Sequence, residues 1–233
     1  MRVMLRRAGM AALSVAMLAV LCLAGVWAVA YYKAPRLVAE LEKSGALSFD
    51  PATLPAARVC ALLAVQDRTF FRHRGIGLLD GPPLHTTMTQ SICKGLYFRR
   101  FSPGLLRYRK IMLMVDALAF DHRISKEMQL RIFMNRAYFG SAGGGEVLGF
   151  EAAARAYFGR DVLQLNDQEY LALVVMLVAP GTYHVAEKPE ANAARVRLLK
   201  GAVEASCPAD CIEKPPHEPC GRPSDDRDGP TRR

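Results

Sequence analysis

The sequence predicts an all-α (predominantly helical) domain joined to a single N-terminal transmembrane helix. Three observations support this fold class. The residues from Ala8 to Ala30 contain neither a charge nor a proline. Several later segments carry apolar residues at helical spacing, and no segment alternates convincingly with the period of two that is typical of strands. With 233 residues, the chain has room for one domain of ordinary size and short extensions.

The uncharged run would form about 34 Å of helix, which is long enough to cross a bilayer. Three arginines precede it and two tyrosines follow it, which predicts a cytoplasmic N-terminus and an outer interface near Tyr31 and Tyr32. A cleaved signal peptide is the alternative, because Ala28-Val29-Ala30 resembles a cleavage site. The run is long for a signal peptide, so we expect an uncleaved anchor. We assign 1–7 to a cytoplasmic basic N-terminus and 8–31 to the transmembrane anchor.

The rest of the chain divides into a helical domain, 32–205, and a tail, 206–233, that is rich in cysteine and proline and expected to be disordered. Caps, glycines and prolines set the helix limits. A capping-box-like pair, Asn166 with Glu169, marks one helix start, and Gly140 to Gly145 is expected to be a glycine-rich turn. The expected helices are Pro35–Gly45, Pro55–Phe71, Thr86–Phe98, Leu105–His122, Ser125–Tyr138, Glu151–Phe158, Asn166–Ala179 and Pro189–Ala205.

The net charge of +9 favours anionic partners such as phosphates or lipid headgroups. No zinc-finger, basic-zipper or aromatic RNA-binding motif accompanies it, so we expect no nucleic acid partner. Cys60 and Cys93 could pair or be buried separately. For the tail, we favour a Cys207–Cys211 or Cys211–Cys220 disulfide over a zinc site that would include His217, because the spacing matches no common ligand pattern.

The stretch from Val65 to Gly75 concentrates an acid, an amide, three arginines, a histidine and two aromatics. Taken alone, it fits an ordinary polar helix end as well as one lip of a cleft for an anionic ligand. Three further stretches favour the cleft. They are Thr86–Lys94, Arg109–Leu113, and the pair Asn135–Gly140 with Gly149–Gly159.

Taken in order, these stretches resemble the five motifs of the peptidoglycan glycosyltransferases (glycosyltransferase family 51, monofunctional biosynthetic transglycosylase-like). The first resembles a Glu-Asp-Arg motif that leads to Phe, His and Gly. The second resembles a Ser-Thr-Ile-Thr-Gln-Gln run that ends in Lys, and the third sits where Arg-Lys-x-x-Glu belongs. The resemblance covers about Pro51 to Leu199.

The resemblance implies a lysozyme-like helical fold that is anchored in the bacterial inner (cytoplasmic) membrane, with the domain on the periplasmic side. It implies a role in cell-wall biogenesis and cell shape through polymerisation of lipid II, an undecaprenyl-pyrophosphate-linked disaccharide-pentapeptide, into glycan strands. Implied partners are lipid II, the nascent glycan strand and cell-wall synthesis proteins. Whether a divalent metal is used is left open. The chain has no room for a transpeptidase domain, which suggests the layout of the monofunctional members.

The sequence departs from the family at the two catalytic glutamates. Gln66 stands where the family has its general base, and an amide cannot take up a proton at neutral pH. Leu113 stands where the second glutamate belongs. Asp67 and Asp116 are candidate substitutes, although Asp67 matches the family's own Asp and should point about 100° away from Gln66 if the helix continues. The residues that match substrate-binding positions are Arg68, Thr87, Gln90, Lys94, Arg109 and Lys110.

Three hypotheses follow. The chain is a pseudoenzyme that binds lipid II or glycan-strand pyrophosphate, an active polymerase with rearranged acids, or a structural scaffold for cell-wall proteins. The retained cationic positions favour the first two. We expect Arg68, Lys94, Arg109 and Lys110 to converge with Thr87 and Gln90 on one cleft.

Overall fold

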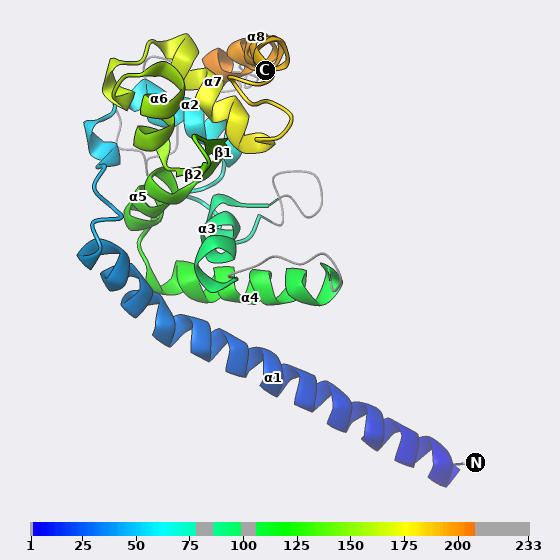
Figure 1. The fold of residues 1–233 in the computed structure, drawn as a ribbon. Coiled ribbons are helices and arrows are strands. Elements are labelled where there is room, and N and C mark those ends of the chain that lie inside the picture. Colours follow the sequence, from blue (N-terminus) through cyan, green and yellow to red (C-terminus); the bar gives the residue numbers. More distant parts are fainter. Residues whose placement is uncertain (1, 78–85, 99–105, 208–233) are drawn as a thin grey trace, which may run out of the picture.

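The computed structural model describes residues 2–77, 86–98 and 106–207, which form a long N-terminal helix and a helical domain with one β-hairpin (Figure 1). This confirms the predicted all-α fold class with an N-terminal apolar helix. The elements are α1 (Arg2–Lys43), α2 (Ala56–Gln66), α3 (Met88–Tyr97), α4 (Leu106–Arg123), α5 (Lys126–Arg136), β1 (Tyr138–Ala142), β2 (Gly145–Leu148), α6 (Phe150–Phe158), α7 (Asp167–Val178) and α8 (Pro189–Ser206), with 3-10 turns at Pro51–Thr53 and Val162–Gln164.

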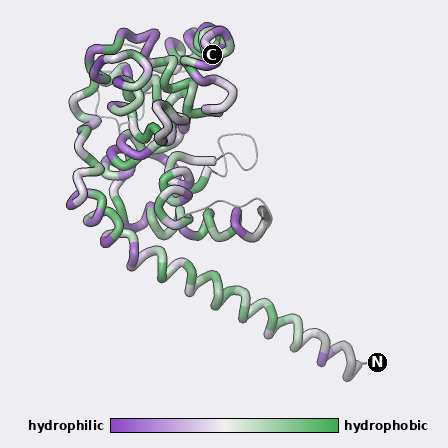
Figure 2. Tube along the Cα trace, viewed as in Figure 1, coloured by the Kyte–Doolittle hydropathy of each residue, from purple (hydrophilic) through white to green (hydrophobic). Residues whose placement is uncertain are grey.

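Helix α1 runs without a break through Pro35, so the separate helix predicted from Pro35 to Gly45 is wrong. Interior proline usually breaks or kinks a helix. Here the turns on both sides of it pack against the domain, since Ala30, Ala34 and Val38 are buried at a spacing of four. The segment Gly9–Lys43 is long and apolar enough to cross a membrane, and Figure 2 shows mostly apolar colouring along the part of α1 that extends away from the domain.

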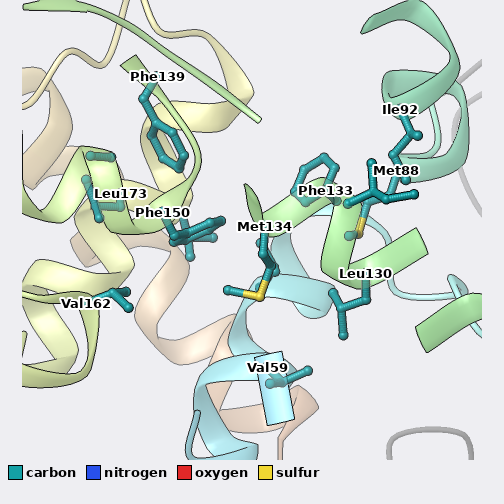
Figure 3. Close-up of a cluster of buried hydrophobic side chains, with 14 of the residues drawn as sticks. Val59, Met88, Ile92, Leu130, Phe133, Met134, Phe139, Phe150, Val162 and Leu173 are labelled. Atoms are coloured by element: carbon teal, nitrogen blue, oxygen red, sulfur yellow. The ribbon is translucent and has the colours of Figure 1, made fainter. Parts of the chain in front are cut away.

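The domain has two layers. The lower layer is α3 and α4, with α4 lying between α3 and α1; the upper layer is α2, α6, α7 and α8 (Figure 1). Helix α5 contacts α3 on one side and α6 on the other, so it connects the layers. Its buried Leu130, Phe133 and Met134 lie between Met88 of α3 and Phe150 of α6 (Figure 3). Each such side chain contributes about 1.5–3 kcal/mol on burial.

The glycine-rich turn predicted over Gly140–Gly145 is instead part of a β-hairpin. Strands β1 and β2 pair antiparallel, with Ser141 opposite Glu146. Gly143 and Gly144 both have positive φ, the conformation that a tight two-residue hairpin turn needs. Strands of five and four residues are too short to show a clear side-chain alternation in the sequence.

The predicted caps are confirmed. The Ser125 hydroxyl accepts a hydrogen bond from Met128 N at the start of α5. Asn166 and Glu169 form a reciprocal capping box at the start of α7, with both bonds at 2.9 Å. Helix α2, however, ends at Gln66 and not at Phe71.

Cys60 of α2 forms a disulfide with Cys207, so the expected pairing of Cys207 with Cys211 is wrong, as is the alternative that Cys60 pairs with Cys93. Cys93 is a buried free thiol. Cys60 and Cys207 are far apart in sequence, and the packing of α8 on α2 brings them together. Cys211, His217 and Cys220, which were considered for a disulfide or a zinc site, lie outside the described residues.

Candidate functional site

Gln66 is the last residue of α2, and its side chain is directed at α7. The amide Nε2 donates a hydrogen bond to the Val174 carbonyl oxygen at 2.8 Å. A carboxylate at this position could not make the bond, because an ionised carboxylate has no proton to donate. The amide is therefore integrated into the packing of α2 on α7.

Asp67 closes α2 in a non-helical conformation, so its direction does not follow the 100° helical step expected from the sequence. Its buried Oδ2 accepts two hydrogen bonds, from the backbone N–H of Met88 at the start of α3 (2.9 Å) and from His73 Nε2 (2.8 Å). The Gly75 N–H donates to His73 Nδ1 at 3.0 Å, so Nε2 carries the proton of a neutral ring. The Asp67–His73 contact is thus a hydrogen bond rather than an ion pair. These contacts give Asp67 a role in holding α3 against the end of α2.

Asp116 lies in a different place, on the part of α4 that faces α3. Its side chain is buried, and burial raises its pKa to about 6. Asp116 acts electrostatically on Cys93 and Tyr97 of α3, and burial together with Asp116 raises the pKa of the Cys93 thiol. The Tyr97 hydroxyl in turn donates to the Ala30 carbonyl of α1 at 3.0 Å. Asp116 therefore belongs to the junction of α3, α4 and α1, whereas Gln66 contacts α7.

Two of the predicted substrate-binding residues shape the N-terminus of α3. Thr87 and Gln90 are buried and form a capping box: Thr87 Oγ1 accepts from Gln90 N (3.1 Å), and Gln90 Oε1 accepts from Thr87 N (2.9 Å). The Thr87 hydroxyl also donates to the Gly75 carbonyl at 2.7 Å. Gly75 has a φ of 86°, and a Cβ there would lie 2.3 Å from the Ala117 carbonyl oxygen, so only glycine fits between α3 and α4.

The four predicted cations lie in three different segments: Lys94 is in the last turn of α3, Arg109 and Lys110 are near the start of α4, and Arg68 follows α2. Lys94 is exposed on α3, and Arg109 and Lys110 are half-buried near the start of α4. Helices α3 and α4 pack together. Arg68 is exposed and donates from Nη2 to Ser206 Oγ at 2.9 Å, so its side chain is directed at the end of α8. Of the predicted set, Thr87 and Gln90 contact each other directly, and Arg68 contacts the end of α8.

A polar network beneath the site was not identified from sequence. Thr89 donates to Gln129 (2.7 Å), Gln129 donates to Asp121 (3.0 Å), and Lys126 forms an ion pair with Asp121 at 2.5 Å. The Lys126 ammonium lies 4.6 Å from the centre of the Phe70 ring. Burial lowers the pKa of Lys126, and Asp121 opposes that shift. Residues spread over three helices carry no local motif, so sequence spacing could not reveal the network.

Metal ligation was left open by the sequence. Within 2–77, 86–98 and 106–207, no three His, Cys, Asp or Glu side chains are grouped so that they could hold a metal ion. We assign no metal ligand among these residues.

Comparison with known proteins adds to this geometry. A family model described as Transglycosylase matches residues 86–203. Penicillin-binding protein 1B of Vibrio cholerae serotype O1 is 30% identical over 166 residues, covering 64% of this chain and 21% of the relative. Penicillin-binding protein 1B of Escherichia coli (strain K12) is 32% identical over 158 residues, covering 62% of this chain and 18% of the relative. The chain therefore spans about a fifth of the length of these relatives.

Proposed function

Since the chain belongs to the transglycosylase family, we propose that it acts in peptidoglycan synthesis as a membrane-anchored protein that binds lipid II or glycan-strand pyrophosphate and is catalytically impaired. Helix α1 would hold the domain at the membrane surface, where a lipid-linked substrate is presented. The proposed loss of catalysis rests on one observation. The Gln66 amide is bonded to the Val174 carbonyl, at the position where the family resemblance implies a proton-accepting glutamate. Loss of a positioned general base costs roughly 10²–10⁴-fold in rate.

The second family acid position supports the same proposal. Leu113 is buried, with 7% of its surface exposed, in the packing of α4. An apolar side chain in the core cannot assist a departing pyrophosphate. The two candidate substitutes are also committed elsewhere: Asp67 holds the start of α3, and Asp116 faces the junction with α1.

Retained binding rests on the cations. Lys94, Arg109 and Lys110 lie on α3 and α4, which pack against each other, and the overall charge of +9 favours an anionic ligand. Hydrogen bonds from such cations to phosphate oxygens contribute about 1.5–3 kcal/mol each. Removing one cation should therefore weaken lipid II binding by roughly one to two orders of magnitude.

The test uses the full chain in detergent with fluorescent lipid II, and measures both binding and polymer length. We expect saturable binding, no polymer above background, and a loss of affinity in Lys94→Ala. Lys200→Ala, an exposed lysine on α8, is the matched control and should bind like wild type. Polymer from the wild-type chain that disappears in Asp116→Asn or Asp67→Asn would establish the active-polymerase alternative. Wild-type binding that Lys94→Ala leaves unchanged would favour a scaffold.

A further inference from the structure

Arg68 is held by the end of α8. Its Nη2 donates to Ser206 Oγ at 2.9 Å, and within the described residues this is the hydrogen bond that fixes the exposed guanidinium. The Ser206 hydroxyl donates its own proton to the Ala202 carbonyl at 2.6 Å. Because that proton is used within α8, the oxygen presents its lone pairs to Arg68. Ser206 is therefore oriented to accept a hydrogen bond from Arg68.

Ser206 is in turn held by the disulfide. Cys207 follows it directly and is bonded to Cys60 of α2, eight residues before Arg68. Cys60 Sγ lies 3.8 Å from the Ser206 carbonyl oxygen, which is a packing contact because a disulfide sulfur carries no proton. The disulfide and the Arg68–Ser206 bond thus connect the last turn of α8 to α2 and to Arg68, the second residue after α2.

From these contacts we infer that Ser206 and the Cys60–Cys207 disulfide form a latch that positions Arg68 for anion binding. Ser206 accepts one N–H of Arg68, and a planar guanidinium has further N–H groups that a phosphate can take. An arginine held in one orientation loses less rotamer freedom when a ligand binds. Arg68 is the binding residue in this proposal, and Ser206 is a positioning residue that acts through it. The inference rests on the proposed anion-binding function of the site.

The latch would also make the site sensitive to a dithiol reductant. Such a reductant supplies two electrons and two protons, the Cys60–Cys207 bond breaks into two thiols, and the reductant becomes a disulfide. The end of α8 then loses its covalent connection to α2. Ser206 is no longer fixed beside Arg68, although both residues remain intact.

The experiment is a double-mutant cycle in the full chain, with lipid II affinity measured for wild type, Ser206→Ala, Arg68→Ala and the double variant. Ser206→Ala keeps the disulfide and should weaken binding about 2- to 12-fold, the value of one immobilised side chain. In the Arg68→Ala background, the same change should have no effect, which a general structural role for Ser206 would not predict. Ser141→Ala, an exposed hydroxyl on β1, is the matched control.

Reduction provides the second arm. Dithiothreitol should weaken wild-type binding by the same factor as Ser206→Ala, and should not affect a Cys60→Ser/Cys207→Ser variant. If Arg68→Ala and Lys94→Ala weaken binding but Ser206→Ala and reduction do not, the latch is wrong and the proposed function stands. If the wild-type chain does not bind lipid II at all, the proposed function fails, and the latch fails with it.

Discussion

The Gln66→Glu substitution tests whether the hydrogen bond of the Gln66 amide stabilises the folded domain. It replaces a donor by an acceptor at nearly constant volume, and sets a carboxylate oxygen opposite the Val174 carbonyl oxygen, where an N–H···O bond of 2.8 Å now lies. Losing this hydrogen bond at the carbonyl of the buried Val174 costs about 1–3 kcal/mol. For a domain of this size, that lowers the melting temperature by about 2–12 °C.

The pH dependence gives a sharper signature. In the folded variant, the carbonyl oxygen favours the protonated acid, which can donate to it, so the pKa of Glu at position 66 should lie above the value of about 4.3 in the unfolded chain. A raised folded-state pKa means that stability falls as pH rises from about 4.3 through that pKa. The deficit relative to wild type should therefore be small in acid and complete at neutral pH.

Thermal unfolding of the full chain in detergent, followed by circular dichroism from pH 4 to pH 8, measures both effects. The control is Gln164→Glu, the same change at an exposed position, which should shift stability by less than about 0.5 kcal/mol. A Gln66→Glu variant that is as stable as the control at every pH would refute the reasoning. It would mean that the position accepts a carboxylate freely and that the fold does not oppose a glutamate at the position of the family's general base.

Three further results are expected. Cys60→Ser with Cys207→Ser should lower the free energy of unfolding by up to about 5 kcal/mol, because the bond closes a loop with a sequence separation of 147, and non-reducing denaturant titrations of both chains measure this. In wild type, stability should decline as pH rises from about 4 to 6, because burial raises the pKa of the Asp116 carboxyl to about 6. Asp116→Asn should remove this decline and stabilise the chain by about 1–3 kcal/mol above pH 6. Equal pH profiles of the two proteins would contradict this. Leu113→Glu should cost more than about 3 kcal/mol, because it buries a charge, whereas Leu113→Met should cost less than about 1.5 kcal/mol. Adding both family acids, at Gln66 and Leu113, should consequently yield an unstable protein and no polymer in the lipid II assay.

The sequence predicted those parts of the fold that depend on neighbouring residues. The caps at Ser125 and Asn166 were correct because the capping side chain and its target N–H are within three residues of each other. The proline in α1 misled the prediction, because packing of Ala30, Ala34 and Val38 overrides a local preference. No local rule reports such tertiary contacts.

In the candidate site, too, local features were predictable from the sequence and long-range contacts were not. The motifs identified Gln66, Asp67 and Thr87 as members of one region, and Asp67 does contact the backbone next to Thr87. Their hydrogen-bond partners were not predictable. Gln66 bonds to a carbonyl 108 residues away, and Arg68 bonds to a serine 138 residues away. Motif spacing says which side chains are present, whereas the packing of distant helices decides what each one contacts.

The unbroken course of α1 into the domain has a mechanical consequence. A flexible linker would let the domain reorient freely above its anchor, but a continuous helix that packs on α4 transmits rotation and tilt directly. Transmembrane helices tilt to match bilayer thickness, by about 20° on average. With α1 as the proposed anchor, a thinner or thicker bilayer would change the angle at which the domain faces the lipid surface, and the composition of the membrane would be one of the variables that set access to the proposed site.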